Sequence, residues 1–266
     1  MFSIFRKLVG DKVTLDLRGE VEDPVEGWRR AAGGPFLIDV PAAKLRVLDF
    51  WGGDPHNPFI VTLQEYAAGR CMEYKGSPLE NFYHCWQPFS GENAGDAGSP
   101  WRQVRAQSKN TAEGRLKRHE FREIARELGV APGEIHGHIK GGPVSQAFGE
   151  ITFRRLARLY DSISRDGFRP ESSAARYPTG FCFAHEGDHR VSIGSGKHRV
   201  TVMLALGWQK IPVELGPPKL PVVIRREEVD RWPNVRSGRY SRDEALGLFD
   251  EMFRRQHPSG WKKAGD

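Results

Sequence analysis

The residues best suited to chemistry in this sequence form a glycine-rich turn that also carries two positive charges. The turn lies between a strand-like and a helix-like stretch and reads Gly-Ser-Gly-Lys-His-Arg. A helix start presents N–H groups that lack intrahelical partners and a partial positive charge. Glycines let backbone amides approach a phosphate closely, and the lysine and arginine add full charges. The pattern predicts a phosphate site made by Gly194, Ser195, Gly196, Lys197, His198 and Arg199.

Regular elements on both sides must hold this turn in place. Residues 180–184 and 190–193 read as the strands of a hairpin whose turn is 186–188. Residues 200–206 are apolar on almost all sides, as in a fully buried helix, and 211–215 read as a further strand. Upstream, Leu156, Leu159 and Ile163 lie on one face of a helix that ends near Gly167. We therefore expect helix, hairpin, glycine turn, buried helix and strand.

This order of elements resembles the ParB/sulfiredoxin superfamily over roughly residues 150–215. The matching pieces are 159–163 (Leu-Tyr-Asp-Ser-Ile), Gly167, Pro170, 196–199 (Gly-Lys-His-Arg), 206–207 (Leu-Gly) and 211–213 (Ile-Pro-Val). The resemblance implies an α/β (α+β) fold with a small mixed-sheet, nucleotide-binding domain at residues 146–266. It also implies that nucleotide phosphates rest on the Gly-x-x-Arg box and that Arg169 and Pro170 border the nucleotide.

At several positions this sequence differs from the known members of the superfamily, and these differences indicate which of their functions it does not share. Lys197 stands where sulfiredoxins carry their reactive cysteine, and no second DNA-reading helix follows as in ParB partition proteins. The related free-serine kinases have a catalytic Asp where this chain has Ser195. If phosphate transfer occurs, the resemblance leaves His198 as a catalytic candidate, with Glu150 or Asp188 as the source of a carboxylate.

The first 145 residues form an α+β region of unknown type, which we expect to be a helix-rich extension. Residues 35–40 read as a strand, and 58–66 fit either a strand or a helix. Ser77, followed by Pro78 and Glu80, is typical of a helix start, and the aromatic residues of 74–88 are expected to pack in a core. A solvated helix is predicted over about 111–128.

Composition limits the partners. The net charge is +6, and the positive excess lies in residues 151–266, with 21 Lys/Arg against 14 Asp/Glu. This favours an anionic partner, either nucleotide phosphates or a nucleic-acid backbone, although a solvated basic surface explains most of these charges equally well. No run approaches the roughly 20 apolar residues of a membrane span. Three scattered cysteines form neither a disulfide framework nor a zinc site, and they favour the cytoplasm.

The sequence thus leaves two main functions open. The first is a nucleotide-binding phosphotransferase or NTPase that acts on a small molecule and uses ATP or CTP, with Mg²⁺ neutralising the phosphates. The second is a non-catalytic nucleotide-sensing or DNA-associated protein, in which nucleic acid binds weakly and without sequence preference. A nuclease would need a metal-binding carboxylate cluster, and the sequence indicates none.

Overall fold

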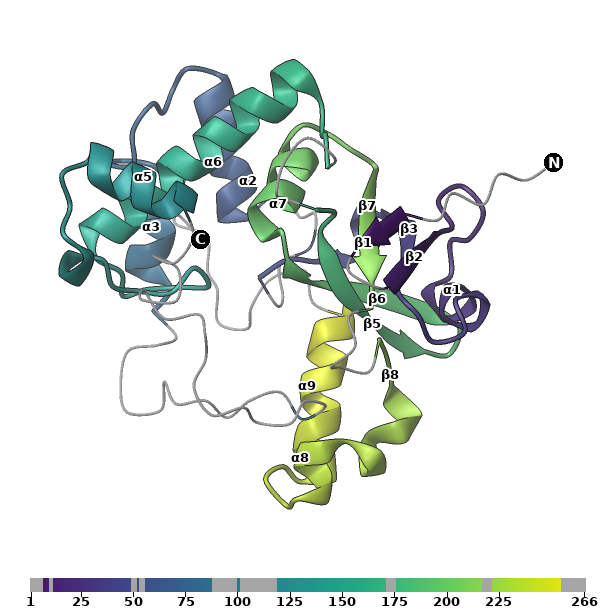
Figure 1. The fold of residues 1–266 in the computed structure, drawn as a ribbon. Coiled ribbons are helices and arrows are strands. Elements are labelled where there is room, and N and C mark those ends of the chain that lie inside the picture. Colours follow the sequence, from purple (N-terminus) through teal and green to yellow (C-terminus); the bar gives the residue numbers. More distant parts are fainter. Residues whose placement is uncertain are drawn as a thin grey trace. The chain divides into compact units, whose positions relative to one another are not determined.

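A mixed sheet of eight described strands is the main element of the fold (Figure 1). This computed structural model describes residues 7–9, 12–48, 52, 56–87, 100, 119–170, 176–216 and 222–254. The strands are β1 Lys7–Val9, β2 Lys12–Asp16, β3 Phe36–Pro41, β4 Leu45–Arg46, β5 Thr179–His185, β6 Asp188–Ser195, β7 Lys210–Leu215 and β8 Val223–Arg225. Their order is β1-β2-β3-β7-β5-β6-β4, and β8 also pairs with β5. The mixed polarity agrees with the predicted α/β class.

The N-terminal strands belong to the same sheet as the predicted nucleotide-binding elements. Strand β3 pairs with β7 in antiparallel fashion over six residues, and β2 joins β3 in parallel. Phe36, Ile38 and Val40 are fully buried and Leu37 nearly so, as expected of a central strand covered on both faces. Over the described residues 7–48 the expected helix-rich extension is therefore wrong, because β2 and β3 pair within the same sheet as β7.

The described helices are mostly short. They are α1 Pro24–Arg30, α2 Pro58–Ala67, α3 Pro78–Cys85, α5 His119–Glu127, α6 Gln146–Asp166, α7 Lys197–Ala205, α8 Pro233–Arg236 and α9 Arg242–Arg254, with 3-10 turns η1 Ala42–Lys44, η3 Pro132–Glu134 and η4 Arg226–Arg231. None of these helices combines the length and apolar character needed to cross a membrane.

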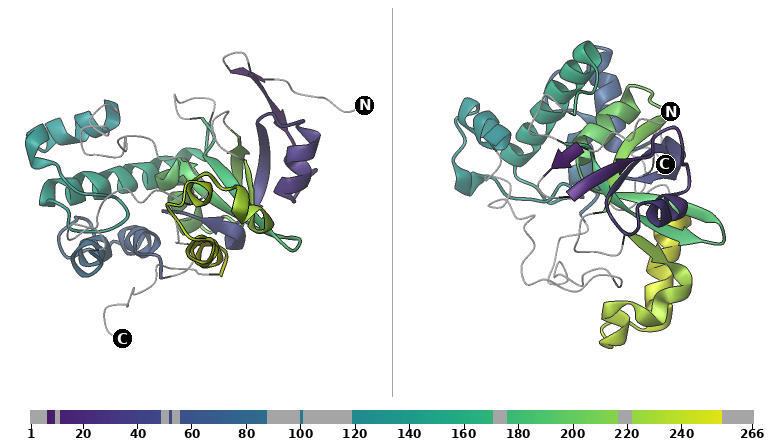
Figure 2. Two further views of the ribbon diagram at one scale, coloured as in Figure 1. Left: turned by 90° about the horizontal axis from the view of Figure 1, so that it is seen from below. Right: turned by 45° about the vertical axis from the view of Figure 1, so that its right-hand side comes forward.

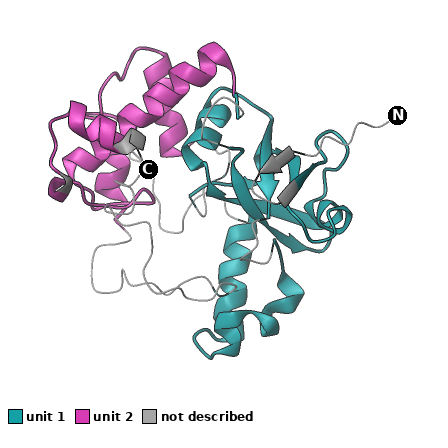
Figure 3. Ribbon diagram, viewed as in Figure 1, with its two compact units in different colours: residues 1–54, 98–104, 169–258 teal, residues 55–97, 105–168, 259–266 magenta. Residues whose placement is uncertain are grey.

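The chain divides into two compact units that are each discontinuous in sequence (Figure 3). Unit 1 comprises residues 1–54, 98–104 and 169–258, and it holds the sheet with α1, α7, α8 and α9. Unit 2 comprises residues 55–97, 105–168 and 259–266, and it holds α2, α3, α5 and α6. These units differ from the expected division at residue 145, because both ends of the chain supply strands to one sheet.

The C-terminal helices of unit 1 cover one part of the sheet. In Figures 1 and 2 this segment is yellow-green to yellow; η4 and α9 contact β5, η4 also contacts β8, and α8 packs against η4. Their buried cluster consists of Phe181, Phe183, Ile224, Val229, Trp232, Ala245, Phe249 and Met252. Two aromatic contacts link the layers, with ring centroids 5.5 Å apart for Phe183 and Phe249 and 5.8 Å apart for Trp232 and Phe249.

Unit 2 has a core of aromatic side chains. Phe59 of α2 meets Phe82 of α3 edge-on at 5.7 Å, and Tyr83 meets Phe148 of α6 at 6.1 Å. The Ser77 hydroxyl accepts the Glu80 N–H at 3.1 Å, so the predicted helix start and core packing are confirmed. The ambiguous stretch 58–66 is helical. The predicted helix over 111–128 is confirmed from His119 to Glu127, whereas 111–118 lie outside the described residues.

Candidate functional site

The predicted glycine turn ends β6 and begins α7. Gly196 is the N-cap of α7 and has the left-handed backbone conformation, with φ of 79°. A Cβ atom added there would lie 2.9 Å from Arg199 Nη2 and 3.0 Å from Pro178 Cα. Glycine is therefore required both for the turn and for the close approach of these groups. The predicted order of helix, hairpin, glycine turn, helix and strand is confirmed, whereas full burial of the helix is not, because residues 200–203 are buried and 204–206 are half-buried.

The first turn of α7 carries positive charge at the positive end of the helix dipole. Lys197, His198 and Arg199 are half-buried, whereas the next four residues are buried and anchor the helix. No acidic residue occupies this first turn. Acids occupy the first turn of α1 (Glu26), α3 (Glu80) and α9 (Asp243 and Glu244), whereas the first turns of α2, α6 and α8 also contain none. The cations Lys197 and Arg199 are therefore the more informative feature of the α7 start. Cations at a helix start are unfavourable by themselves, and an anion bound there would reverse this.

A short extended segment, residues 176–178, lies beside this turn. The Arg199 guanidinium donates a hydrogen bond from Nη1 to the Arg176 carbonyl oxygen. The Pro178 carbonyl accepts the backbone N–H of Glu214 at 2.8 Å, which ties the segment to β7. The Arg18 guanidinium lies 5.2 Å from the centre of the Tyr177 ring. Arg199 therefore has a structural role in bracing this segment as well as a position suited to an anion.

A carboxylate that sequence reasoning missed lies at the same end of the sheet as the turn. Thr179 pairs with Ser195 on one neighbouring strand, across a register shift in the β5–β6 pairing, and with Glu214 on the other. Thr179 and Glu214 are regular cross-strand partners and share a face of the sheet, and Ser195 continues this row of residues to α7. Burial raises the pKa of the half-buried Glu214 carboxyl, and the nearby positive charge of Arg176 opposes this effect.

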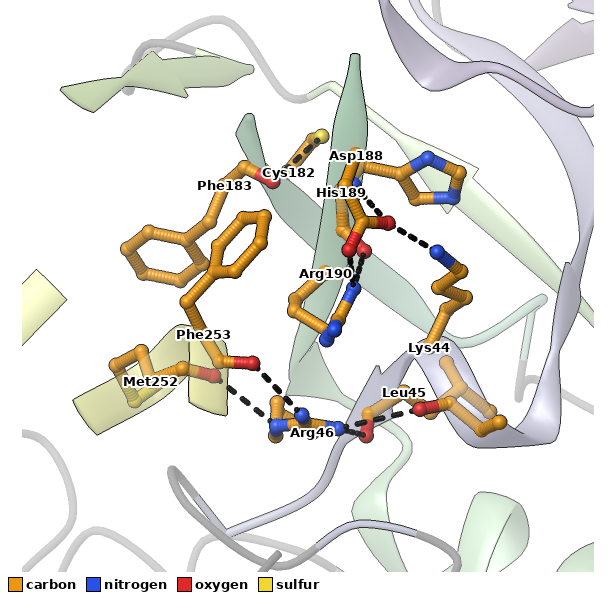
Figure 4. A network of polar contacts seen from close by, with 11 residues as sticks. Lys44, Leu45, Arg46, Cys182, Phe183, Asp188, His189, Arg190, Met252 and Phe253 are labelled. Atoms are coloured by element: carbon orange, nitrogen blue, oxygen red, sulfur yellow. Dashed lines mark hydrogen bonds and ion pairs between the residues drawn. The ribbon is translucent and has the colours of Figure 1, made fainter. Parts of the chain in front are cut away.

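The structure does not bring Asp188 to the glycine turn. Asp188 lies at the opposite end of β6, seven residues from Ser195, or about 23 Å along an extended strand. Its carboxylate accepts hydrogen bonds from Lys44 Nζ, from the His189 N–H and from Arg190 Nη1 (Figure 4). Burial favours a higher pKa for Asp188, but these donors outweigh it and hold the pKa well below its ordinary value. Its expected role as a carboxylate near the turn is therefore not supported by its position.

The other predicted candidates lie in α6 and directly after it. Glu150 belongs to α6 in unit 2, not to unit 1 as α7 does, and it accepts a hydrogen bond from Gln146 Nε2 at 3.4 Å. Arg169 is exposed and Pro170 is half-buried after the end of α6 at Gly167. Residues 171–175 lie outside the described part of the chain. The described structure thus brings together residues 194–199, and to these it adds residues 176–179 and Glu214.

A second cationic cluster lies at the hairpin-turn end of the sheet and is built differently. Arg46 is 1% exposed, and its guanidinium donates to the carbonyl oxygens of Met252 at 3.0 Å, Phe253 at 3.1 Å and Leu45 at 2.8 Å (Figure 4). Burial, with the charge of Arg190 nearby, lowers the pKa of Arg46 to about 10. Arg190 also lies over the Phe253 ring at 4.6 Å. This cluster ties the C-terminal end of α9 to β4 and β6.

Neither a search for metal-binding side chains nor comparison with known proteins identifies a ligand for this site. Within the described ranges, no group of three or more His, Cys, Asp or Glu side chains is arranged to hold a metal ion. Comparison with protein-family models, curated proteins and solved structures finds no match to this chain. The superfamily resemblance therefore stays a prediction that rests on the residues and element order given above.

Proposed function

We propose that this protein binds a nucleotide through its phosphates at the start of α7 and is an ATP- or CTP-dependent phosphotransferase or NTPase acting on a small molecule. One observation carries the proposal. The glycine-capped start of α7 has Lys197 and Arg199 but no acid in its first turn. The helix dipole and both side chains therefore favour an anion at the same place. The ParB/sulfiredoxin-like order of elements supports the choice of a nucleotide.

Magnesium would come with the nucleotide in this proposal. The described residues contain no dedicated metal cluster, and Mg²⁺ is commonly held by substrate phosphates with only one or two protein carboxylates. Its charge would neutralise the triphosphate beside the α7 start. Cys71, Cys85 and Cys182 are free thiols, which favours a reducing compartment such as the cytoplasm.

Calorimetric titration of ATP, CTP and tripolyphosphate, each with Mg²⁺, tests the phosphate site. Arg199→Ala should weaken binding of all three by about ten- to hundred-fold, because a hydrogen bond to a charged group contributes about 1.5–3 kcal/mol. Lys197→Ala should cost less, since lysine is a flexible point charge and arginine a planar fork. Arg242→Ala is the matched control, because this arginine lies at the start of α9 and contacts Asp230.

The folded state of each variant must be checked by circular dichroism, because Arg199 also holds the Arg176 carbonyl. Unchanged affinity in folded Arg199→Ala and Lys197→Ala proteins would contradict the phosphate site. Equal weakening in Arg242→Ala would reduce the effect to overall charge.

A further inference from the structure

The row of residues Ser195, Thr179 and Glu214, on three neighbouring strands, extends the candidate site away from the phosphate turn. Ser195, Thr179 and Glu214 lie on β6, β5 and β7, which can be followed in Figure 1. Neighbouring strands are about 4.8 Å apart, so Glu214 lies about 10 Å across the sheet from Ser195. In a nucleoside triphosphate, the distance between the terminal phosphate and the ribose is similar to this spacing. Glu214 is therefore placed where the non-phosphate part of the ligand would lie.

The Glu214 carboxylate is suited to accept a hydrogen bond from a ligand. Within the described part of the chain, its oxygens make no hydrogen bond or ion pair, although the side chain is half-buried. Its backbone is fixed, because the N–H donates to the Pro178 carbonyl at 2.8 Å and β7 is paired on both sides. Burial raises its pKa, and the nearby positive charge of Arg176 only partly offsets this effect. A half-buried carboxylate without a donor gains most from a ligand that supplies one.

We propose that Glu214 accepts a hydrogen bond from the ribose hydroxyl groups of the nucleotide whose phosphates lie at α7. This inference rests on the proposed nucleotide site and names the sugar as a second element that the protein recognises. Ribose hydroxyls are neutral donors, and a carboxylate is an acceptor only, so the two match directly. A second phosphate at this position would be repelled by the charge of Glu214.

The test compares ATP, 2′,3′-dideoxy-ATP and tripolyphosphate, each with Mg²⁺, by calorimetric titration of the full chain. Wild type should bind ATP about ten- to hundred-fold more tightly than the dideoxy analogue, since the contact is a charge-assisted hydrogen bond. Glu214→Gln should lose most of this preference and bind tripolyphosphate as wild type does. Because Gln removes a half-buried charge without changing shape, the variant should unfold at a temperature no lower than that of wild type.

Glu22→Gln is the matched control, since Glu22 is exposed and contacts Lys210 at the far end of the same strand at 2.7 Å. It should keep the preference for ATP over the dideoxy analogue. A Glu214→Gln protein that also keeps this preference would overturn the ribose contact alone. Failure of both ATP and tripolyphosphate to bind wild type would overturn the phosphate site itself, and the ribose contact with it.

Discussion

The C-terminal end of α9 and the N-terminal end of α7 both meet arginine side chains, with opposite electrostatic consequences. At α9, the buried Arg46 donates to the carbonyls of Met252 and Phe253, so a full positive charge meets the negative end of a helix dipole. At α7, Lys197 and Arg199 stand at the positive end of the dipole, where no acid occupies the first turn. In the first arrangement the side-chain charge and the helix dipole attract each other. In the second they have the same sign, so both favour an added anion.

This difference separates a stabilising cluster from a candidate binding site, although both consist of strands, a helix end and cations. Buried charge is tolerated at Arg46 because carbonyl oxygens satisfy its donors. Residues placed for binding are often unfavourable in the free protein, and stability is lost there in exchange for affinity. Each cluster can be tested by substitutions whose effects on stability differ in size and sign.

The largest expected effect is the loss of stability on substitution of Arg46, whose guanidinium binds the carbonyl oxygens at the end of α9. Arg46→Ala should lower the free energy of unfolding by about 2–4 kcal/mol, because it leaves buried carbonyl oxygens without donors. Urea denaturation followed by circular dichroism measures this change. Arg254→Ala is the control on the same helix. Its side chain is 77% exposed, so the expected change stays within about 0.5 kcal/mol. A loss below about 1 kcal/mol for Arg46→Ala would show that the carbonyls of α9 find other donors.

A smaller, pH-dependent effect is expected at the hairpin turn. Because its pKa is lowered in the folded protein, Asp188 contributes stability that is fully present above its ordinary pKa near 4 and is lost progressively as the pH falls from there through the lowered pKa. Asp188→Asn should therefore cost about 1 kcal/mol at pH 7, since the group is partly exposed, and this cost should shrink as the pH falls from about 4 to 2. Thermal unfolding of both proteins from pH 7 to pH 2 checks this. A constant gap between the two curves would contradict the assigned ion pairs.

Local patterns in the sequence predicted much of what surrounds the α7 site. The hairpin, the glycine turn and the helix after it follow from strand periodicity, turn chemistry and the required backbone of Gly196, all within a few residues of one another. The helix at 58–67 could also have been predicted. Asn57 followed by Pro58 is the same cap-and-proline signal that identified the helix after Ser77.

Long-range pairing could not be predicted in this way. Strand β3 pairs with β7 across about 175 residues of sequence, and no local pattern reports such a partner. This pairing explains why the N-terminal strands join the sheet instead of forming a separate extension. Glu214 was missed because alternation along β7 shows only that its side chain lies on the face opposite Ile211, Val213 and Leu215, and not which residues of other strands lie beside it. Only the pairing of β5 with β6 and β7 shows that Glu214 lies in line with Thr179 and Ser195.

The most direct test of the central claim is the double readout of Lys197→Glu. This change removes a cation from the start of α7 and places an acid there, so the free protein should become more stable by about 0.5–1 kcal/mol. The same change should abolish ATP binding, because the phosphates would then meet a carboxylate. Urea denaturation and calorimetric titration of one protein preparation give both values. Higher stability with loss of binding is the predicted result, whereas lower stability or retained binding would contradict an anion site at the start of α7.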